Sequence, residues 1–132
     1  MTQNSVRIFE MSPREGLQNE PLSIPTAAKI ALINLLSKCG FADIEATSFV
    51  SPKWVPQLAD GAAVMAAIDR LPSVSYAALV PNMTGFERAL AAGVNSIGIF
   101  AAASQSFSQK NINCSIAESL DRLAGHGGRG GA

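Results

Sequence analysis

VRIFEMSPREGLQNE, residues 6–20, is the stretch from which the fold of this chain is predicted. Residues 6–11 form a short apolar run rich in residues that favour β-strands, and the Ser-Pro pair after them ends the strand. Arg14 and Glu15 therefore follow the C-terminal end of a strand. In parallel α/β sheets and barrels that end carries the chemistry, so we expect a functional site in this segment.

The residues after this strand supply donors and acceptors for such a site. Arg14 can stabilise a developing oxyanion, and the carboxylate of Glu15 can bind a hard cation through oxygen. Gly16 allows a turn, and the amide of Gln18 follows it closely. On residue chemistry alone, an exposed ion pair on a polar turn explains the same pattern, and both interpretations are open at this point.

Composition limits the classes of protein. A chain of 132 residues with 48% hydrophobic and 15% charged residues suits one soluble globular domain. Ten basic and ten acidic side chains cancel, and no apolar run is long enough to span a bilayer. We therefore expect no nucleic-acid or membrane partner. Cys39 and Cys114 lack CxxC spacing, and few residues precede the first strand, so we expect reduced thiols, no signal peptide and a cytoplasmic location.

Strand-like and helix-like segments alternate along the rest of the chain. Each apolar run is followed by a polar turn and then by apolar residues at helical spacing. This alternation favours an α/β fold with a parallel sheet. The further strands are expected at residues 43–50, 76–80 and 96–100, and the helices are expected from Ser23 or Thr26 as the cap to Cys39-Gly40, at residues 62–71 and 85–92, and from a capping box of Ser115 and Glu118 to Leu123.

An acidic residue stands inside the second expected strand. Glu45 lies in DIEATSFV, which is otherwise typical of a buried strand. A buried carboxylate is costly unless it faces a polar site, so we expect Glu45 to face a site near Arg14. A purely structural salt bridge is the alternative. The following SPKWVP, residues 51–56, predicts a rigid loop in which Trp54 either lines a substrate pocket or packs over the end of the sheet.

The end of the chain has a different composition. GHGGRGGA, residues 125–132, is too rich in glycine to extend the last expected helix. We therefore expect one domain over residues 1–124 and a disordered tail over residues 125–132. His126 is the only histidine, and in such a tail we expect it to be a bystander and not a metal ligand.

Three motifs in this sequence resemble one enzyme family. They are PREGLQNE at residues 13–20, TSFVSPKWVPQ at residues 47–57 and KNINCS at residues 110–115. Together they resemble the hydroxymethylglutaryl-CoA lyase family, one of the metal-dependent lyases and aldolases with a pyruvate carboxyltransferase domain. The resemblance implies a TIM (β/α)8-barrel fold, of which this chain holds about the first four β/α units, an incomplete barrel.

The resemblance also implies an activity and a site. It implies metal-assisted retro-aldol cleavage of 3-hydroxy-3-methylglutaryl-CoA to acetyl-CoA and acetoacetate, a reaction of leucine catabolism and ketone-body formation. By position in the motifs, Arg14 would steady the enolate oxygen, Glu45 matches an active-site glutamate and Gln18 lies near the substrate. Glu15 stands where the family usually has a metal-binding aspartate, and the cofactor would be Mg²⁺ or Mn²⁺.

Two departures from the family pattern shape these expectations. Glu15 is one methylene longer than aspartate, and Mg²⁺ tolerates displaced ligands poorly. The family's two histidine ligands, its asparagine ligand and its catalytic cysteine belong to the later half of the barrel, and neither Cys39 nor Cys114 matches that cysteine. We therefore expect this chain to be inactive alone and to form homo-oligomers or aggregates through exposed barrel edges. The alternatives are a related synthase that joins an acyl-CoA to a 2-oxo acid, and a non-catalytic half-barrel that assembles with itself.

Overall fold

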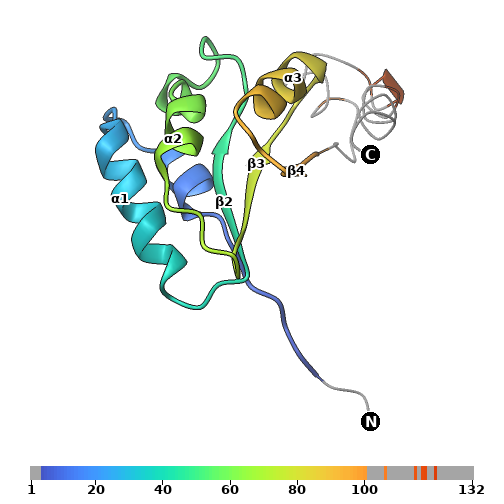
Figure 1. Cartoon of the computed structure of the whole chain (residues 1–132). Helices are drawn as coiled ribbons and strands as arrows, with labels where there is room; N and C mark the ends of the chain where they lie inside the picture. Colours follow the sequence, from blue (N-terminus) through green and yellow to red (C-terminus); the bar gives the residue numbers. More distant parts are fainter. Residues whose placement is uncertain (1–3, 101–105, 107–114, 116, 119–120, 122–132) are drawn as a thin grey trace.

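Strands and helices alternate along the chain, as the sequence predicts (Figure 1). The computed structural model describes residues 4–100, 106, 115, 117–118 and 121. Within them, four parallel strands pair in chain order, which confirms the expected α/β class. The strands are β1 (Phe9–Glu10), β2 (Asp43–Ser48), β3 (Ser75–Leu79) and β4 (Ser96–Gly98), the helices are α1 (Thr26–Ser37), α2 (Gly61–Ala67) and α3 (Met83–Ala91), and the short turns are η1 (Ser12–Gly16) and η2 (Pro56–Leu58).

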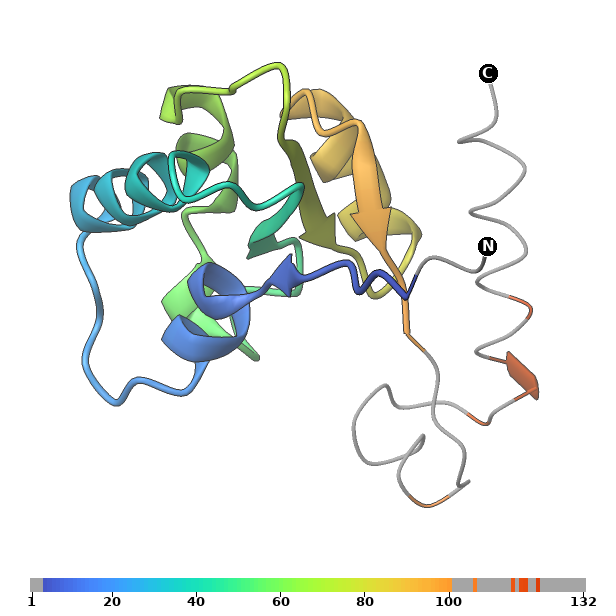
Figure 2. The ribbon, with the colours of Figure 1, turned by 90° about the horizontal axis from the view of Figure 1, so that it is seen from below.

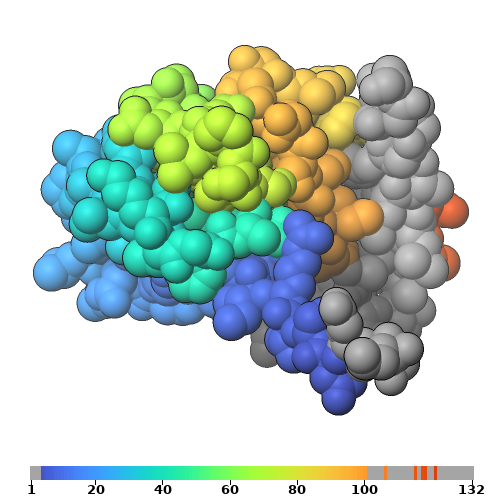
Figure 3. All heavy atoms as spheres, turned by 60° about the horizontal axis from the view of Figure 1, so that its bottom comes forward, coloured from blue at the N-terminus to red at the C-terminus, as the bar shows by residue number. Residues whose placement is uncertain are grey.

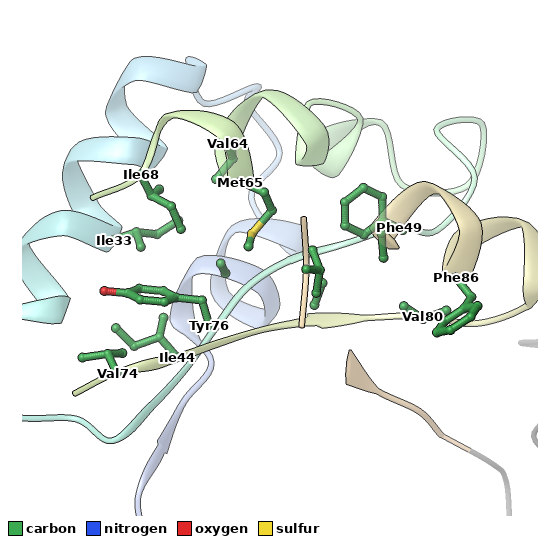
Figure 4. Packing of buried hydrophobic residues seen from close by; sticks show 14 residues of the cluster. Ile33, Ile44, Phe49, Val64, Met65, Ile68, Val74, Tyr76, Val80 and Phe86 are labelled. Atoms are coloured by element: carbon green, nitrogen blue, oxygen red, sulfur yellow. The ribbon is translucent and has the colours of Figure 1, made fainter. Parts of the chain in front are cut away.

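The three helices lie along one face of the sheet, as the view from below shows most clearly (Figure 2). Their apolar side chains meet those of β2 and β3 in a single core, and Figure 4 shows Met65 of α2 pointing from its helix towards the strands. Side chains alternate along a strand, and Ile44 and Ala46 both belong to this core. Glu45, which stands between them, therefore points to the face of the sheet opposite the helices.

The first strand is shorter than predicted. Only Phe9–Glu10 pairs with β2, and the chain before it runs on with exposed side chains, Val6 being 88% exposed. The prediction of a strand over residues 6–11 was wrong in extent because β1 lies at the edge of the described sheet. With a neighbour on one side only, an apolar sequence has nothing to pack against within the described residues.

Helix boundaries also differ from the sequence pattern. The residue before α1 is Pro25, and neither Ser23 nor Thr26 caps the helix. The Thr26 hydroxyl instead donates to Oδ2 of Asp60 at 2.6 Å. Helix α2 ends at Ala67 and not near Leu71, because the chain becomes extended at Ile68.

The other expected elements agree with the structure to within about two residues. Asn82 accepts a hydrogen bond from the Gly85 amide at 2.9 Å and so caps α3. The capping box before the last expected helix is present, since Ser115 Oγ accepts from the Glu118 amide and Glu118 accepts from the Ser115 amide. The glycine-rich tail, the domain boundary at residue 124, Cys114 and most of KNINCS lie outside the described residues.

At the N-terminal ends of the strands, an ion pair joins the segment before β1 to the first residue of β2. Arg7 Nη2 donates to Asp43 Oδ1 at 2.7 Å, and Arg7 Nε donates to the other carboxylate oxygen. A pocket of about 530 Å³ opens at this end and is bordered by Arg7, Arg70 and residues 71–76. Figure 3 shows the same end of the molecule, where the first strand meets the turn before β3. Arg70 also binds protein oxygens, those of Gly93 and Met65, so both arginines of this pocket are already engaged.

The Arg7–Asp43 pair predicts a pH dependence of stability. Hydrogen bonds from Arg7 hold the pKa of Asp43 below its usual value, although burial opposes them. A lowered folded-state pKa gives stability that is present above the usual pKa of about 4 and is lost as the pH falls through the folded value. Urea unfolding at pH 6 should therefore show Asp43→Asn to be less stable than the parent, and this difference should shrink towards pH 2.5.

The matched control is Arg7→Gln, which removes the cause of the shift and keeps Asp43. This variant should lose the same pH-dependent part of the stability as Asp43→Asn. A difference between parent and Asp43→Asn that stays constant from pH 6 to pH 2.5 would contradict the assignment of this ion pair.

Candidate active site

The short turn η1 after β1 places the Arg14 side chain next to Glu45 of β2. The Arg14 and Glu15 amides both donate to the Met11 carbonyl, at 3.1 and 2.7 Å, and Pro13 occupies the start of the turn. The expected polar loop is thus a single turn of π-helix, Ser12–Gly16. Proline suits the first helical positions because its missing N–H would have no partner there. The turn directs the Arg14 side chain towards β2.

Arg14 and Glu45 form a buried ion pair. Arg14 Nε donates to Glu45 Oε1 at 2.5 Å, and the two residues are 8% and 4% exposed. The prediction that Glu45 lies near Arg14 is therefore confirmed. The alternative interpretation, in which Arg14 belongs to an exposed ion pair on a polar turn, is wrong because Arg14 is buried. The low exposure matters because removing one partner of such a pair leaves a buried charge without compensation.

Arg14 also contacts the other two candidate residues. Its Nη1 lies 2.5 Å from Glu15 Oε2 and 3.4 Å from Gln18 Oε1. The Glu15 side chain is 58% exposed, so it lies at the open side of the site. All four residues proposed from the sequence thus meet around one guanidinium. Within the described residues Arg14 Nη2 has no hydrogen-bond partner, and this leaves a donor for a bound oxygen.

The described residues do not complete a metal site. No cluster of three or more His, Cys, Asp or Glu side chains occurs among them, and the carboxylates of Glu15 and Glu45 both bind Arg14. A hard cation such as Mg²⁺ takes about six oxygen ligands in near-octahedral geometry. Glu15 is the more accessible of the two carboxylates and so the better candidate for one such ligand.

The loop after β2 begins beside this site. Residues 51–55 fold into a turn in which the Trp54 and Val55 amides donate to the Ser51 carbonyl, at 2.9 and 3.2 Å. Trp54 is exposed, so packing of its ring over the end of the sheet is not what the structure shows. The rigid-loop prediction is confirmed, whereas a role for Trp54 at a substrate pocket stays a prediction.

Sequence reasoning missed a second polar cluster, centred on Lys29. The buried face of α1 is formed by Lys29, Ile33 and Ser37, at intervals of four residues. Lys29 Nζ donates to Asp60 Oδ1 at 2.7 Å and to the Gln57 carbonyl. A lysine in line with Ile33 on the apolar stripe was the available signal, since a lysine on a core-facing position needs a partner.

Known proteins with similar sequences are consistent with this geometry. The family model described as HMGL-like matches residues 5–126. This chain belongs to the HMGL-like family. Among curated relatives of this HMGL-like chain, the mitochondrial hydroxymethylglutaryl-CoA lyase of Gallus gallus is 57% identical over 119 residues, which are 90% of this chain and 40% of that protein. The cytoplasmic 3-hydroxy-3-methylglutaryl-CoA lyase of Mus musculus is 57% identical over 118 residues, 89% of this chain and 34% of that protein.

Solved structures of HMG-CoA lyases share the fold. The Bacillus subtilis enzyme matches with a TM-score of 0.89 and 51% identity, over 92% of this chain and 41% of that one. The Acinetobacter baumannii enzyme, in complex with coenzyme A and 3-methylmalate, matches with a TM-score of 0.88 and 42% identity, over 93% and 41%. The HMGL-like chain thus spans about 40% of the length of the relatives it matches. Its parallel sheet and helices correspond to the N-terminal part of their TIM barrels, as the sequence predicted.

Among the described residues, no helix has the length and apolar character needed to cross a membrane. The HMGL-like relatives include both mitochondrial and cytoplasmic proteins, so the cytoplasmic location expected from the sequence stays a prediction.

The buried pair at this site predicts a large loss of stability on removal of one charge. Glu45→Gln keeps the size of the side chain and removes the buried carboxylate partner of Arg14, which then keeps only the largely exposed Glu15 carboxylate. We expect the free energy of unfolding to fall by about 3 kcal/mol, measured by urea denaturation at pH 7. The double variant Glu45→Gln with Arg14→Met should recover part of this loss, because no charge is then left alone. Equal stability of the parent and Glu45→Gln would show that the pair is not a buried one.

Proposed function

We propose that this chain forms the N-terminal part of the active site of a hydroxymethylglutaryl-CoA lyase. The reaction is the cleavage of 3-hydroxy-3-methylglutaryl-CoA to acetyl-CoA and acetoacetate, assisted by Mg²⁺ or Mn²⁺. The observation that carries the proposal is the buried guanidinium of Arg14, which lies just past β1 and binds both Glu45 and Gln18. The two curated relatives described above are lyases named for this substrate, which supports this reaction over a bond-forming synthase.

The chemistry of the cleavage assigns a role to Arg14. The tertiary hydroxyl of the substrate loses its proton and becomes the ketone of acetoacetate, while the bond to the thioester methylene breaks. The electron pair of that bond passes to the acetyl-CoA fragment, which becomes an enolate and then takes up a proton. Arg14 Nη2 can donate to the enolate oxygen, and a buried cation stabilises such a charge far better than one in water.

Glu45 and Gln18 hold the guanidinium in place for this role. Glu45 binds Nε and Gln18 faces Nη1, so the orientation of the planar fork is fixed before the substrate arrives. Preorganised donors are effective because they need no rearrangement as charge develops. Glu15, at the exposed side, is proposed as one oxygen ligand of the divalent cation, which would supply Lewis-acid chemistry when bound.

We propose that residues 1–124 act as the domain that carries this site, and that turnover needs the later part of the barrel. The described residues supply one accessible carboxylate near Arg14 and no cluster of metal ligands. The four strands leave β1 and β4 at the two edges of the described sheet. A coenzyme A thioester is the proposed substrate class, and a solved relative holds coenzyme A together with 3-methylmalate.

The first test of this function uses a chimera in which residues 1–123 are joined to the later part of a related lyase. Arg14→Lys should reduce turnover at least about a hundredfold with little change in melting temperature, because lysine keeps the charge and lacks the fork. Acetoacetate release is the measurement, and the 132-residue chain alone should give none. Arg7→Lys is the matched control and should keep full activity, because Arg7 lies at the other end of β2.

The second test concerns the length of the Glu15 side chain in the same chimera. Misplacing a catalytic group by about 1 Å can cost on the order of a hundredfold in rate, and glutamate is longer than the aspartate usual at this position. Glu15→Asp should therefore raise turnover, measured as acetoacetate release, or tighten Mn²⁺ binding, measured by isothermal titration calorimetry. Glu20→Asp makes the same change on an exposed residue of the same segment and should alter neither. If Arg14→Lys and Glu15→Asp both leave turnover and metal affinity unchanged, the site assignment is wrong.

A further inference from the structure

The strongest feature outside the candidate site is the cluster around Lys29. Lys29 is 5% exposed and so carries a charge in the interior, between α1 and the start of α2. Its Nζ binds Asp60 Oδ1 at 2.7 Å and the Gln57 carbonyl, while Thr26 binds the second Asp60 oxygen at 2.6 Å. Charge-assisted bonds of this kind are about twice as strong as neutral ones. The cluster joins the start of α1 to the chain that leads into α2.

The position of Asp60 shows that the cluster is not an ordinary helix cap. Asp60 stands directly before α2, where an aspartate usually accepts a hydrogen bond from the second or third helical amide. Here its side chain makes no such bond and faces α1 instead. The local stabilisation of α2 is thus replaced by a connection between two helices that are far apart in sequence.

The same residues connect the two segments that follow β1 and β2. Gln57 donates from its side chain to the Glu20 carbonyl at 3.3 Å, and its own carbonyl accepts from Lys29. Glu20 lies at the end of the segment that carries Arg14, and Gln57 lies in η2, which directly follows the loop that carries Trp54. In Figure 1 the helices α1 and α2, from which Lys29 and Asp60 reach each other, lie side by side.

We propose that Lys29 is a positioning residue that holds the segment after β1, with Arg14, Glu15 and Gln18, against the loop after β2, with Trp54. Lys29 itself touches no candidate active-site residue. It fixes the Gln57 backbone, and Gln57 fixes Glu20. The relevance of this positioning to catalysis rests on the proposed lyase function, whereas the positioning itself does not.

Hydrogen exchange in the 132-residue chain tests the proposal. The reporters are hydrogen-bonded amides of the two segments, those of Asn19 and Glu20 after β1 and those of Trp54 and Val55 after β2. The reference amides are Ser75, which donates to the Ala42 carbonyl just before β2, and Val80, which donates to the Gly98 carbonyl in β4. In Lys29→Met the reporters should exchange at least about tenfold faster relative to the reference amides. The reason is that local opening of these segments then breaks no Lys29 hydrogen bonds and so costs less free energy.

A double variant separates positioning from general stability. Lys29→Met with Asp60→Asn leaves no uncompensated charge, so the melting temperature should return towards that of the parent. The Gln57 carbonyl still lacks its donor, so the reporter amides should stay fast. Asp43→Asn is the matched control, since it breaks an ion pair at the other end of β2. It should leave the reporters unchanged relative to Val80, because the other reference amide, Ser75, pairs beside residue 43.

A milder variant keeps the test informative if Lys29→Met does not fold. Gln57→Ala removes only the bond to the Glu20 carbonyl, and it should speed the Asn19 and Glu20 amides while leaving Trp54 and Val55 as in the parent. The proposal is overturned if the reporters are unchanged in the folded variants, or if their exchange simply follows the melting temperature, including recovery in the double variant. Because no turnover is measured, this result is independent of the Arg14→Lys assay.

Discussion

The structure depends on one constraint, which is that a carboxylate inside a buried strand must have a cation. Glu45 lies in β2, where every residue is buried, and an isolated charge there would cost several kcal/mol. Arg14 supplies the cation from a different part of the chain. For its guanidinium to reach Glu45, the chain must turn directly after β1. The π-helical turn Ser12–Gly16 meets this requirement.

The two faces of the sheet carry different kinds of residue. The face covered by α1, α2 and α3 holds the apolar core, which stabilises the fold. The opposite face carries Glu45, and polar residues gather where the strands end. One ion pair, Arg7–Asp43, lies at the start of β2, and the other, Arg14–Glu45, lies further along β2 at the candidate site. Both pairs are expected to stabilise the fold, and only the second lies beside the other candidate residues, Glu15 and Gln18.

Polar residues that local rules assign to helix ends serve long-range contacts here. Thr26 and Asp60 both stand where a side-chain cap is expected, and instead they bind each other across α1 and α2. Lys29 completes this contact from the buried face of α1. Capping contributes about 1 kcal/mol to a single helix, whereas a shared charged cluster fixes the relative position of two helices and the loops before them.

The α/β alternation and the strands β2 and β3, to within about two residues, could be predicted from the sequence, because they depend on local periodicity and on neighbours within a few positions. The candidate residues Arg14, Glu15 and Gln18 came from the polar segment after the first expected strand, and their roles came from the family resemblance. The sequence also required a partner for Glu45, because burial of a carboxylate is costly wherever it occurs.

The contacts between distant residues could not be predicted from the sequence and are seen in the structure alone. The structure showed that Arg14 turns back to bind Glu45 and that β1 pairs over Phe9–Glu10 alone. It also showed that Thr26 and Lys29 bind Asp60. Each of these contacts joins residues more than thirty positions apart. Such contacts depend on how the helices and strands pack, and local propensity contains no information about that packing.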